Sequence, residues 1–299
     1  MKSLDRAIES LEGLSVGDAF GQCFFQTGDS TEALIQARTL PPAPWYYTDD
    51  TEMSLSIVAV LARHRTIDQD QLAHSFAAHY HYDRAYGPSM HRKLERIRNG
   101  EAWREVAAGG FGGQGSYGNG AAMRVAPLGV YFCDDPLVIE HQAALSAAVT
   151  HAHPEGIAGA VAVALAAGEA FRCRGQSRRP SHGDFLEAIV SRLPHSEVRS
   201  KLVRAQAMES VQSLQFPVAV LGNGTDMSAQ DTVPFALWCC AQSLDNYSNA
   251  LWLAVAALGD RDTICAIVGG VVSCYTGAAG IPPEWRVLRE ALPTWHLNA

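Results

Sequence analysis

Carboxylate and hydroxyl side chains are concentrated at two points of the sequence, each directly before an apolar stretch. Residues 48–53 read Thr-Asp-Asp-Thr-Glu-Met, and residues 259–263 read Gly-Asp-Arg-Asp-Thr. Asp and Thr oxygens are ligands for hard cations such as Mg²⁺ and Mn²⁺, whereas zinc prefers Cys and His. Adjacent carboxylates also repel each other unless a cation or hydrogen-bond donors offset their charge. The two segments together predict a shared two-ion cluster where two helix starts converge.

Helix capping is the alternative explanation for both segments. Asp49 and Glu52 have the spacing of a capping box, and Met53, Ile57 and Val60 continue with helical periodicity. One cap needs one Asp or Thr, however, whereas four oxygen-bearing side chains precede the Glu. On the first segment alone the cap and the cation site stay equally open, and the second segment favours the cation site.

Residues 109–120, with the sequence GGFGGQGSYGNG, contain seven glycines in twelve positions. Such density lets backbone N–H groups approach and cradle a phosphate. The segment lacks the Gly-Lys-Ser/Thr ending of a P-loop and the preceding strand of a dinucleotide fingerprint. A surface loop is the alternative, although Ser116, Tyr117 and Asn119 add donors and an aromatic face.

A His-x-His pair lies in residues 150–156, Thr-His-Ala-His-Pro-Glu-Gly. No third ligand at suitable spacing supports a zinc site. A hydrogen-bonding histidine in a pocket, or a helix start with Pro154 in its first turn, is favoured instead.

Helical periodicity dominates the rest of the chain. Three segments read as helices: an Ala-rich stretch at 156–171, then 246–258 and 263–275. The Val-rich residues 216–221 have strand composition but stand alone, and no β-α-β rhythm is present. The longer connections are 26–47 and 98–120. We therefore predict an all-α fold with a single compact domain over residues 1–299.

Two stripes of small residues recur at helical spacing. The first is Gly13, Gly17 and Gly21, and the second is Ala266, Gly269, Gly270, Ser273 and Gly277. Both would let helix backbones pack closely and bring the two Asp-rich segments together. The alternative is that some of these glycines end helices.

Composition limits the partners. The 23 Lys and Arg against 31 Asp and Glu give a net charge of −8, and no basic run is present, which argues against nucleic acid. The sequence has no stretch of about 18 uninterrupted apolar residues, so we expect no membrane span. The N-terminus does not read as a signal peptide, and seven cysteines without a C-x-x-C motif predict reduced thiols in a cytoplasmic protein. Without a heptad seam we expect a monomer.

Six segments, in order, resemble the ADP-ribosylglycohydrolase (DraG-like, ADP-ribosyl-acceptor hydrolase) family. They are GLSVGDAFG at 13–21, TDDTEM at 48–53, GSYGNGAAMRVAPLG at 115–129, THAHPEGIAGA at 150–160, VPFALW at 233–238 and GDRDT…GAAGIP at 259–282. The resemblance implies an all-α domain with a cleft that holds two Mg²⁺ or Mn²⁺ ions. The metal ligands it implies are Thr48, Asp49, Asp50, Asp260, Asp262 and Thr263.

The same resemblance implies a hydrolase that removes ADP-ribose from a modified serine, threonine or arginine side chain of a protein. The loop Gly115–Gly120 would hold the ribose and diphosphate, and the GSYGNG form is most similar to the serine-directed branch. The implied substrate-binding residues are Phe111, Gly115, Ser116, Tyr117, Gly118, Asn119, Gly120, Met123 and His151. The implied catalytic carboxylates are Asp49, Asp50 and Asp262.

One position departs from the family pattern. Many members carry a Glu shortly after the first Gly-Asp-Ala, and this sequence has Phe25 at that position. Some bacterial relatives instead resemble a pattern with an acid directly after the Gly that follows this motif, and this sequence has Gln22 there. A neutral amide cannot act as a carboxylate base. The alternative function is therefore a catalytically impaired ADP-ribose-binding protein. A structural protein on the same fold, as in J1-type lens crystallins, and a metal-dependent phosphatase explain fewer of the motifs.

Overall fold

The regular structure is helical throughout the residues described by this computed structural model, which are 1–25 and 27–297. The first half contains α1 (Ser3–Cys23), α2 (Thr31–Gln36), α3 (Asp49–His64), α4 (Gln69–Ala78), α5 (Pro88–Arg98), α6 (Trp103–Ala108), α7 (Ala126–Tyr131) and α8 (Pro136–Ala148). The second half contains α9 (Pro154–Cys173), α10 (His182–Val190), α11 (Glu197–Gln206), α12 (Gln215–Leu221), α13 (Ala229–Gln242), α14 (Tyr247–Val255), α15 (Arg261–Thr276) and α16 (Pro283–Leu288).

Short 3₁₀ turns complete the secondary structure: η1 (Gly28–Ser30), η2 (Gly110–Gly113), η3 (Asn119–Ala121), η4 (Ala278–Gly280) and η5 (Trp295–Leu297). Only isolated β-bridges, Trp45 with Arg289 and Gly118 with Ser228, occur among the described residues in place of strands. The all-α prediction is confirmed.

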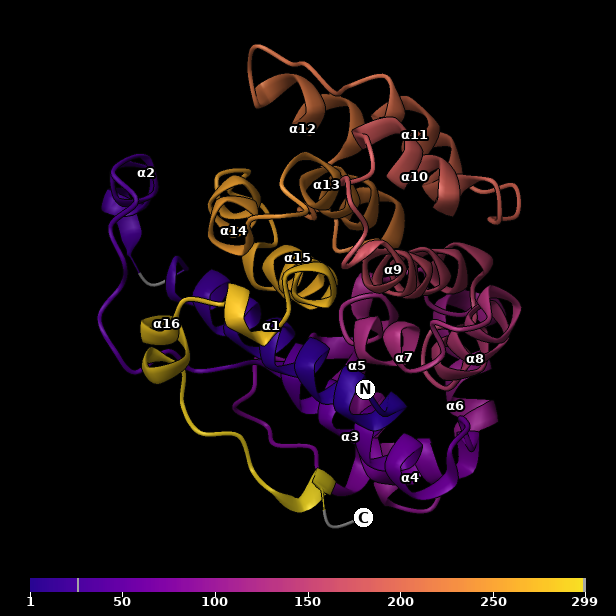
Figure 1. Cartoon of the computed structure of the whole chain (residues 1–299). Coiled ribbons are helices and arrows are strands. Elements are labelled where there is room, and N and C mark those ends of the chain that lie inside the picture. Colours follow the sequence, from indigo (N-terminus) through magenta and orange to yellow (C-terminus); the bar gives the residue numbers. More distant parts are fainter. Residues whose placement is uncertain (26, 298–299) are drawn as a thin grey trace.

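The first and last long helices, α1 and α15, lie side by side at the centre of the molecule (Figure 1). Their backbones approach so closely that a Cβ atom on Gly17 would lie 2.1 Å from the carbonyl oxygen of Cys265. A Cβ on Gly21 would lie 2.3 Å from the carbonyl oxygen of Arg261. The small-residue stripes therefore bring the end of α1 against the start of α15, while Gly277 ends α15 with a positive φ, as the alternative for these glycines expects.

Helix α9 is the Ala-rich segment that the sequence predicts, and it packs against α7, α8, α13 and α15. By length and composition alone it is apolar enough to cross a membrane, but 78% of its most apolar window is buried inside the protein. Small side chains allow its neighbours to approach closely, so its apolar character is accounted for by the packing of the core.

Aromatic rings fix the end of α1 to segments from elsewhere in the chain. Phe20 stacks on Trp285 with 4.6 Å between ring centroids, and it also contacts Trp45 at 5.6 Å. Phe24 meets Phe20 edge to face. Because Trp45 lies three residues before Thr48, this cluster helps to set where α3 begins. All seven cysteines are free, as the sequence predicts.

Two local alternatives can now be decided. Residues 216–221, whose composition also suits a strand, belong to helix α12, in agreement with the all-α prediction, and Pro217 is tolerated in the first helical turn. Helix α3 begins at Asp49, as the sequence indicates, but without the capping box that was the alternative explanation of this segment. The Glu52 carboxylate instead accepts hydrogen bonds from the His81 backbone N–H at 3.0 Å and the Tyr86 hydroxyl at 2.8 Å.

Candidate active site

A cavity of about 560 Å³ lies among the end of α1, the start of α3, the start of α15 and the glycine segment. Most residues that the sequence singles out line its wall: Gln22, Phe25, Asp49, Ser116, Tyr117, Gly118, Asn119, Gly120, Met123, His151, Asp260, Asp262 and Thr263. Thr48, Asp50 and Gly115 are not on that wall. The Phe111 side chain lies outside the part of the chain that the structure describes.

Asp18 connects α1 to the start of α3 and is the main residue that the sequence analysis missed. Its carboxylate is fully buried and accepts four hydrogen bonds, from the backbone N–H and hydroxyl groups of Thr48 and Thr51, at 2.5–3.1 Å. Burial nevertheless raises its pKa to about 6. Asp18 therefore positions the whole Thr-Asp-Asp-Thr segment. The only signal for it was the Gly-Asp-Ala sequence beside the first glycine stripe.

Asp50 is buried with one of its carboxylate oxygens lacking a partner. The Thr48 hydroxyl lies 2.9 Å from its Oδ2 and 2.8 Å from Asp18 Oδ1, although a hydroxyl has only one hydrogen to donate. Its Oδ1 is buried without any hydrogen bond. Burial, and then the charge of Asp18, raises the pKa of Asp50 well above its usual range. A bound cation would satisfy the orphaned oxygen and offset the repulsion.

Three further carboxylates, Asp49, Asp260 and Asp262, lie around the same point. Burial raises the pKa of Asp262 to about 6, and it raises the pKa of Asp49 and Asp260 well above the usual range. Mutual repulsion adds to this shift, with Asp18 and Asp260 acting on Asp49. Such a concentration of buried negative charge is typical of a cation site.

The donor set fits Mg²⁺ or Mn²⁺ better than zinc. In the described part of the chain, no three His, Cys, Asp or Glu side chains are grouped as ligands of one ion. Mg²⁺ does not need such a group, because it keeps several waters and is bound through one or two carboxylates. The hydroxyls of Thr48 and Thr263 add oxygen donors of the same kind, so the residues present fit such an ion.

Asn119 joins the glycine segment to the second Asp-rich segment. Its side-chain amide donates to Asp260 Oδ2 at 2.6 Å and to Thr232 Oγ1 at 2.9 Å. Both hydrogens of the amide are therefore used within the protein. The structure makes Asn119 a tether between loop and acidic cluster, and its contact with substrate stays a prediction.

The glycine loop is held in place, in contrast to the free surface loop that was the alternative. Ser116 is buried, and its Oγ accepts a hydrogen bond from the Gly118 N–H at 3.2 Å. The Asn119 N–H donates to the Met227 carbonyl at 3.1 Å. Gly120 lies directly over His151, where a Cβ would come within 2.8 Å of the imidazole. The loop therefore forms a fixed wall of the cavity.

His151 is a neutral imidazole beneath this loop. Burial, and then the nearby charge of Arg124 and Lys93, lowers its pKa well below the usual value. Arg124 donates to Thr150 Oγ1 at 2.8 Å, and that hydroxyl lies 2.7 Å from His151 Nδ1. Since arginine can only donate, the Thr150 hydrogen is free for Nδ1. This arrangement favours a proton on Nε2, the ring atom nearer the loop glycines.

The second histidine of the His-x-His pair has a different role. His153 is the N-cap of α9 and accepts a hydrogen bond from the Glu155 N–H at 3.1 Å, with Pro154 in the first turn. Its ring meets that of Tyr117 edge to face at 5.4 Å. The helix start predicted here is confirmed, and His153 also supports an aromatic residue on the cavity wall.

Several wall residues carried no signal in the sequence. They are Ala85, Tyr86, Gly87, Pro88, Ser89, Met90, Asp226 and Met227. Asp226 adds an exposed carboxylate near the glycine loop. Gln22 is on the wall one helical turn after Asp18, and Phe25 is exposed there with the Arg261 guanidinium 4.4 Å from its ring centroid.

Comparison with known proteins identifies the family. The family model of ADP-ribosylglycohydrolases matches residues 1–296. The chain belongs to the ADP-ribosylglycohydrolase family. Its relatives in this family include human ADP-ribosylhydrolase ARH3, 29% identical over 95% of this chain and 89% of the relative. An uncharacterised protein of Archaeoglobus fulgidus is 31% identical over 91% of this chain and 88% of its own length.

A bacterial member and a solved structure extend the comparison. The ADP-ribosylarginine hydrolase Tri1 of Pseudomonas putida is 24% identical over 95% of this chain and 74% of its own length. A solved structure of an ADP-ribosylglycohydrolase-related protein complex superposes with a TM-score of 0.70 at 24% identity, over 97% of this chain and 93% of the other. That likeness establishes the helical fold. As a glycohydrolase of this family, the chain acts on ADP-ribosyl groups.

Proposed function

We propose that this protein is a Mg²⁺- or Mn²⁺-dependent hydrolase that releases ADP-ribose from a modified side chain of another protein. The observation that supports this best is the orphaned Oδ1 of Asp50, which lies with three other buried aspartates and the partly buried Asp260 beside a cavity lined by a fixed glycine loop. A cavity of about 560 Å³ lies within the range of small-molecule sites, about 300–1,000 Å³.

The residues that would hold the cation are Thr48, Asp49, Asp50, Asp260, Asp262 and Thr263. When bound, two such ions stabilise negative charge and orient hydroxyl groups and water at the bond to be cut. Asp18 keeps the first three ligands in place through its four hydrogen bonds. Asn119 holds Asp260, a proposed metal ligand, against the glycine loop that would bind the nucleotide.

The chain's own residues divide the substrate between them. The glycine loop and the Nε2–H of His151 offer hydrogen-bond donors to the ribose and diphosphate, and Tyr117 offers an aromatic face. Cleavage at the anomeric carbon develops oxocarbenium character, which the negative field of the carboxylates stabilises. Asp49 and Asp262 line the cavity and are placed to take a proton from water.

A hydroxyl linkage to serine or threonine is the form we favour. The GSYGNG sequence of the loop supports it, and the arginine-directed Tri1 shares only 24% identity with this chain. A monomer in the cytoplasm, acting on ADP-ribosylated protein without nucleic acid or membrane, remains part of the proposal.

The experiment measures ADP-ribose release from serine-, threonine- and arginine-linked peptides, with Mg²⁺, with Mn²⁺ and with chelator. We expect metal-dependent release, abolished in Asp49→Ala and Asp262→Ala. Release that continues in chelator, or at the parent rate in both variants, would contradict the proposed function.

Gln22 supports a second candidate, an ADP-ribose binder without turnover. Its neutral amide is on the cavity wall one turn from Asp18, at the position where the family resemblance implies an acid in some members. Gln22→Glu should restore release if the missing carboxylate is the reason for silence. Calorimetry with ADP-ribose separates the two candidates. Tight binding of ADP-ribose by the parent and by Gln22→Glu, with no release from any linkage, favours the binder.

A further inference from the structure

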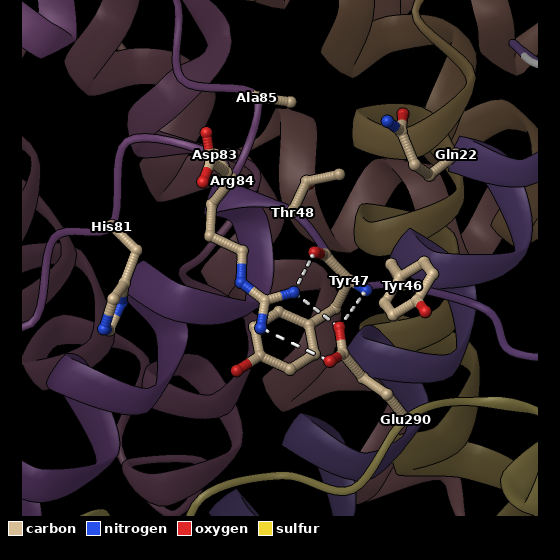
Figure 2. Close-up of a pocket in the computed structure, with 9 residues that line it drawn as sticks. All are labelled: Gln22, Tyr46, Tyr47, Thr48, His81, Asp83, Arg84, Ala85 and Glu290. Carbon is tan, nitrogen blue, oxygen red and sulfur yellow. Dashed lines mark hydrogen bonds and ion pairs between the residues drawn. The ribbon is translucent and has the colours of Figure 1, made fainter.

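A second cavity of about 500 Å³ adjoins the candidate active site. Figure 2 shows the residues that line it. Gln22 and Ala85 line both cavities. Thr48 lines the second cavity, and the next residue, Asp49, lines the first. None of the described residues of the loop Gly115–Gly120 lines the second cavity. The two cavities therefore meet at the acidic cluster, and the second extends from it on the side without the glycine loop.

We propose that this second cavity binds the polypeptide that carries the ADP-ribosyl group, and that it recognises a basic side chain of that polypeptide. This inference rests on the proposed function. If the bond is cut at the acidic cluster with ADP-ribose along the glycine loop, the acceptor must leave on the other side of the cluster. The second cavity is the hollow that adjoins the cluster there.

The wall of this cavity is held in one shape by contacts among its own residues. The Arg84 guanidinium donates to Glu290 Oε1 at 2.5 Å and to the Tyr47 carbonyl at 2.9 Å, and it lies 3.8 Å from the centroid of the Tyr47 ring (Figure 2). The Asp49 N–H donates to the Arg84 carbonyl at 2.8 Å. The cavity wall is thus fixed directly to the acidic cluster.

These contacts leave the cavity with free negative charge. Arg84 is neutralised by Glu290, and the His81 ring is bound to Glu52. The Asp83 carboxylate is exposed and has no hydrogen bond or ion pair among the described residues. The charge that a ligand would meet is therefore that of Asp83, which attracts a lysine or arginine side chain.

Tyr46 supplies the second half of the recognition. It is 55% exposed on the wall of the same cavity, and its hydroxyl has no partner among the described residues. An exposed aromatic face attracts a cation such as the side chain of arginine or lysine. An aromatic ring with a free carboxylate in one hollow selects a cation over an anion or a neutral group.

The test compares two ADP-ribosyl-serine peptides that differ only in a Lys or Glu next to the modified serine, together with ADP-ribosyl-serine as the free amino acid. Release is measured for the parent, Asp83→Asn, Asp83→Lys and Tyr46→Ala. Glu209→Gln, which removes an exposed carboxylate remote from both cavities, is the matched control.

We expect the parent to favour the Lys peptide about tenfold in kcat/KM, mainly through KM, as one exposed ion pair and one cation–π contact allow. Asp83→Asn and Tyr46→Ala should each reduce the preference, and Asp83→Lys should reverse it. All variants should release ADP-ribose from the free amino-acid conjugate at the parent rate. A parent that treats the two peptides alike, or a preference that is undiminished in Asp83→Asn, overturns the inference.

Binding measurements keep this test separate from that of the proposed function. If no peptide is hydrolysed, the affinities of the same two peptides are compared by calorimetry. A Lys preference in binding that Asp83→Asn reduces supports the peptide site while the hydrolase proposal fails, and a preference that Asp83→Asn leaves undiminished overturns the peptide site. Equal affinities, or no binding of either peptide, overturn the peptide site.

Discussion

At the scale of single residues, two aspartates in the same cluster have opposite hydrogen-bonding states. Asp18 has four donors around its carboxylate, whereas Asp50 keeps a buried oxygen without any. A buried carboxylate with a full set of donors is part of the framework. One left incomplete costs free energy unless a ligand supplies what is missing.

We predict that Asp50→Asn stabilises the metal-free protein and removes its response to Mg²⁺. The substitution removes a carboxyl whose pKa is raised by burial and by its acidic neighbours, so the free energy of unfolding in chelator should increase. In the parent, Mg²⁺ at a hundred times its dissociation constant should add about 2.7 kcal/mol. Thermal unfolding with chelator and with Mg²⁺ measures both effects.

Asp134→Asn is the control for that experiment, since Asp134 pairs with Arg6 at the surface and its side chain is 77% exposed. It should change stability by less than about 1 kcal/mol and leave the Mg²⁺ response intact. A full Mg²⁺ response in Asp50→Asn would show that this residue does not hold the ion.

At the scale of helices, the close contact of α1 with α15 sets the geometry of the acidic cluster. Gly17 precedes Asp18, and Cys265, whose carbonyl faces Gly17, comes three residues after Asp262. The separation of the two backbones therefore fixes the separation of carboxylates from opposite ends of the chain. Widening this contact would move the two halves of the ligand set apart.

We predict that Gly17→Ala reduces activity more than stability. Its Cβ would lie 2.1 Å from the Cys265 carbonyl oxygen, a contact that only a shift of the helices can relieve. Overpacking of this kind costs about 1–3 kcal/mol of folding free energy. A displacement of about 1 Å at the site can cost on the order of a hundredfold in rate. Urea unfolding and kcat for ADP-ribose release measure the two losses.

Gly183→Ala provides the comparison, because a Cβ at Gly183, within α10, meets no atom within 4 Å. It should leave activity unchanged and alter stability by less than about 1 kcal/mol. Parent-like activity in Gly17→Ala would mean that the helix separation does not control the site.

Periodicity and residue type explain which elements were predictable. The helices α3, α9, α14 and α15 follow apolar periodicity, and two Asp-rich starts with two glycine stripes indicate that their ends meet. The role of Asp18 in positioning the start of α3 could not be predicted. A lone Asp in a helix gives no local sign that its hydrogen-bond donors lie 30 residues away in the sequence. The positions of Tyr86 and Asp226 on the cavity wall result from tertiary packing, which leaves no pattern in the local sequence. The spacing of Glu52 from Asp49 fits a capping box whether or not its side chain points back to the helix start.

At the scale of the whole molecule, buried charge of opposite sign lies on two sides of the cavity. The acidic cluster occupies one side, and Arg124, Lys93 and the neutral His151 lie behind the glycine loop on the other. Arg124 is fully buried, and burial lowers its pKa to about 9. A net charge of −8 gives no indication of this separation. It suits a ligand whose diphosphate and developing cation need opposite fields.

We predict that the contribution of Lys93 to the free energy of unfolding increases with pH in alkaline solution. Burial, and then the charge of Arg124, lowers the Lys93 pKa from 10.5 to about 8. Between these values the unfolded chain keeps a proton that the folded protein has released, so this residue makes the free energy of unfolding rise with pH. Lys93→Met should therefore lose stability relative to the parent as pH increases from 8 to 10.5. Urea unfolding at both limits measures the difference, with the exposed Lys2→Met as control; a constant difference would contradict the prediction.

The contact between α1 and α15 also has a consequence for how the chain is made. The two helices are about 250 residues apart in sequence, so a ribosome adding roughly 5–20 residues per second needs on the order of ten to fifty seconds between them. Throughout that time the glycine face of α1 has no partner, and Asp18 has only the start of α3 beside it. The acidic cluster is thus among the last features to form during synthesis, and a nascent chain would need its first helix shielded from other apolar surfaces until the last long helix emerges.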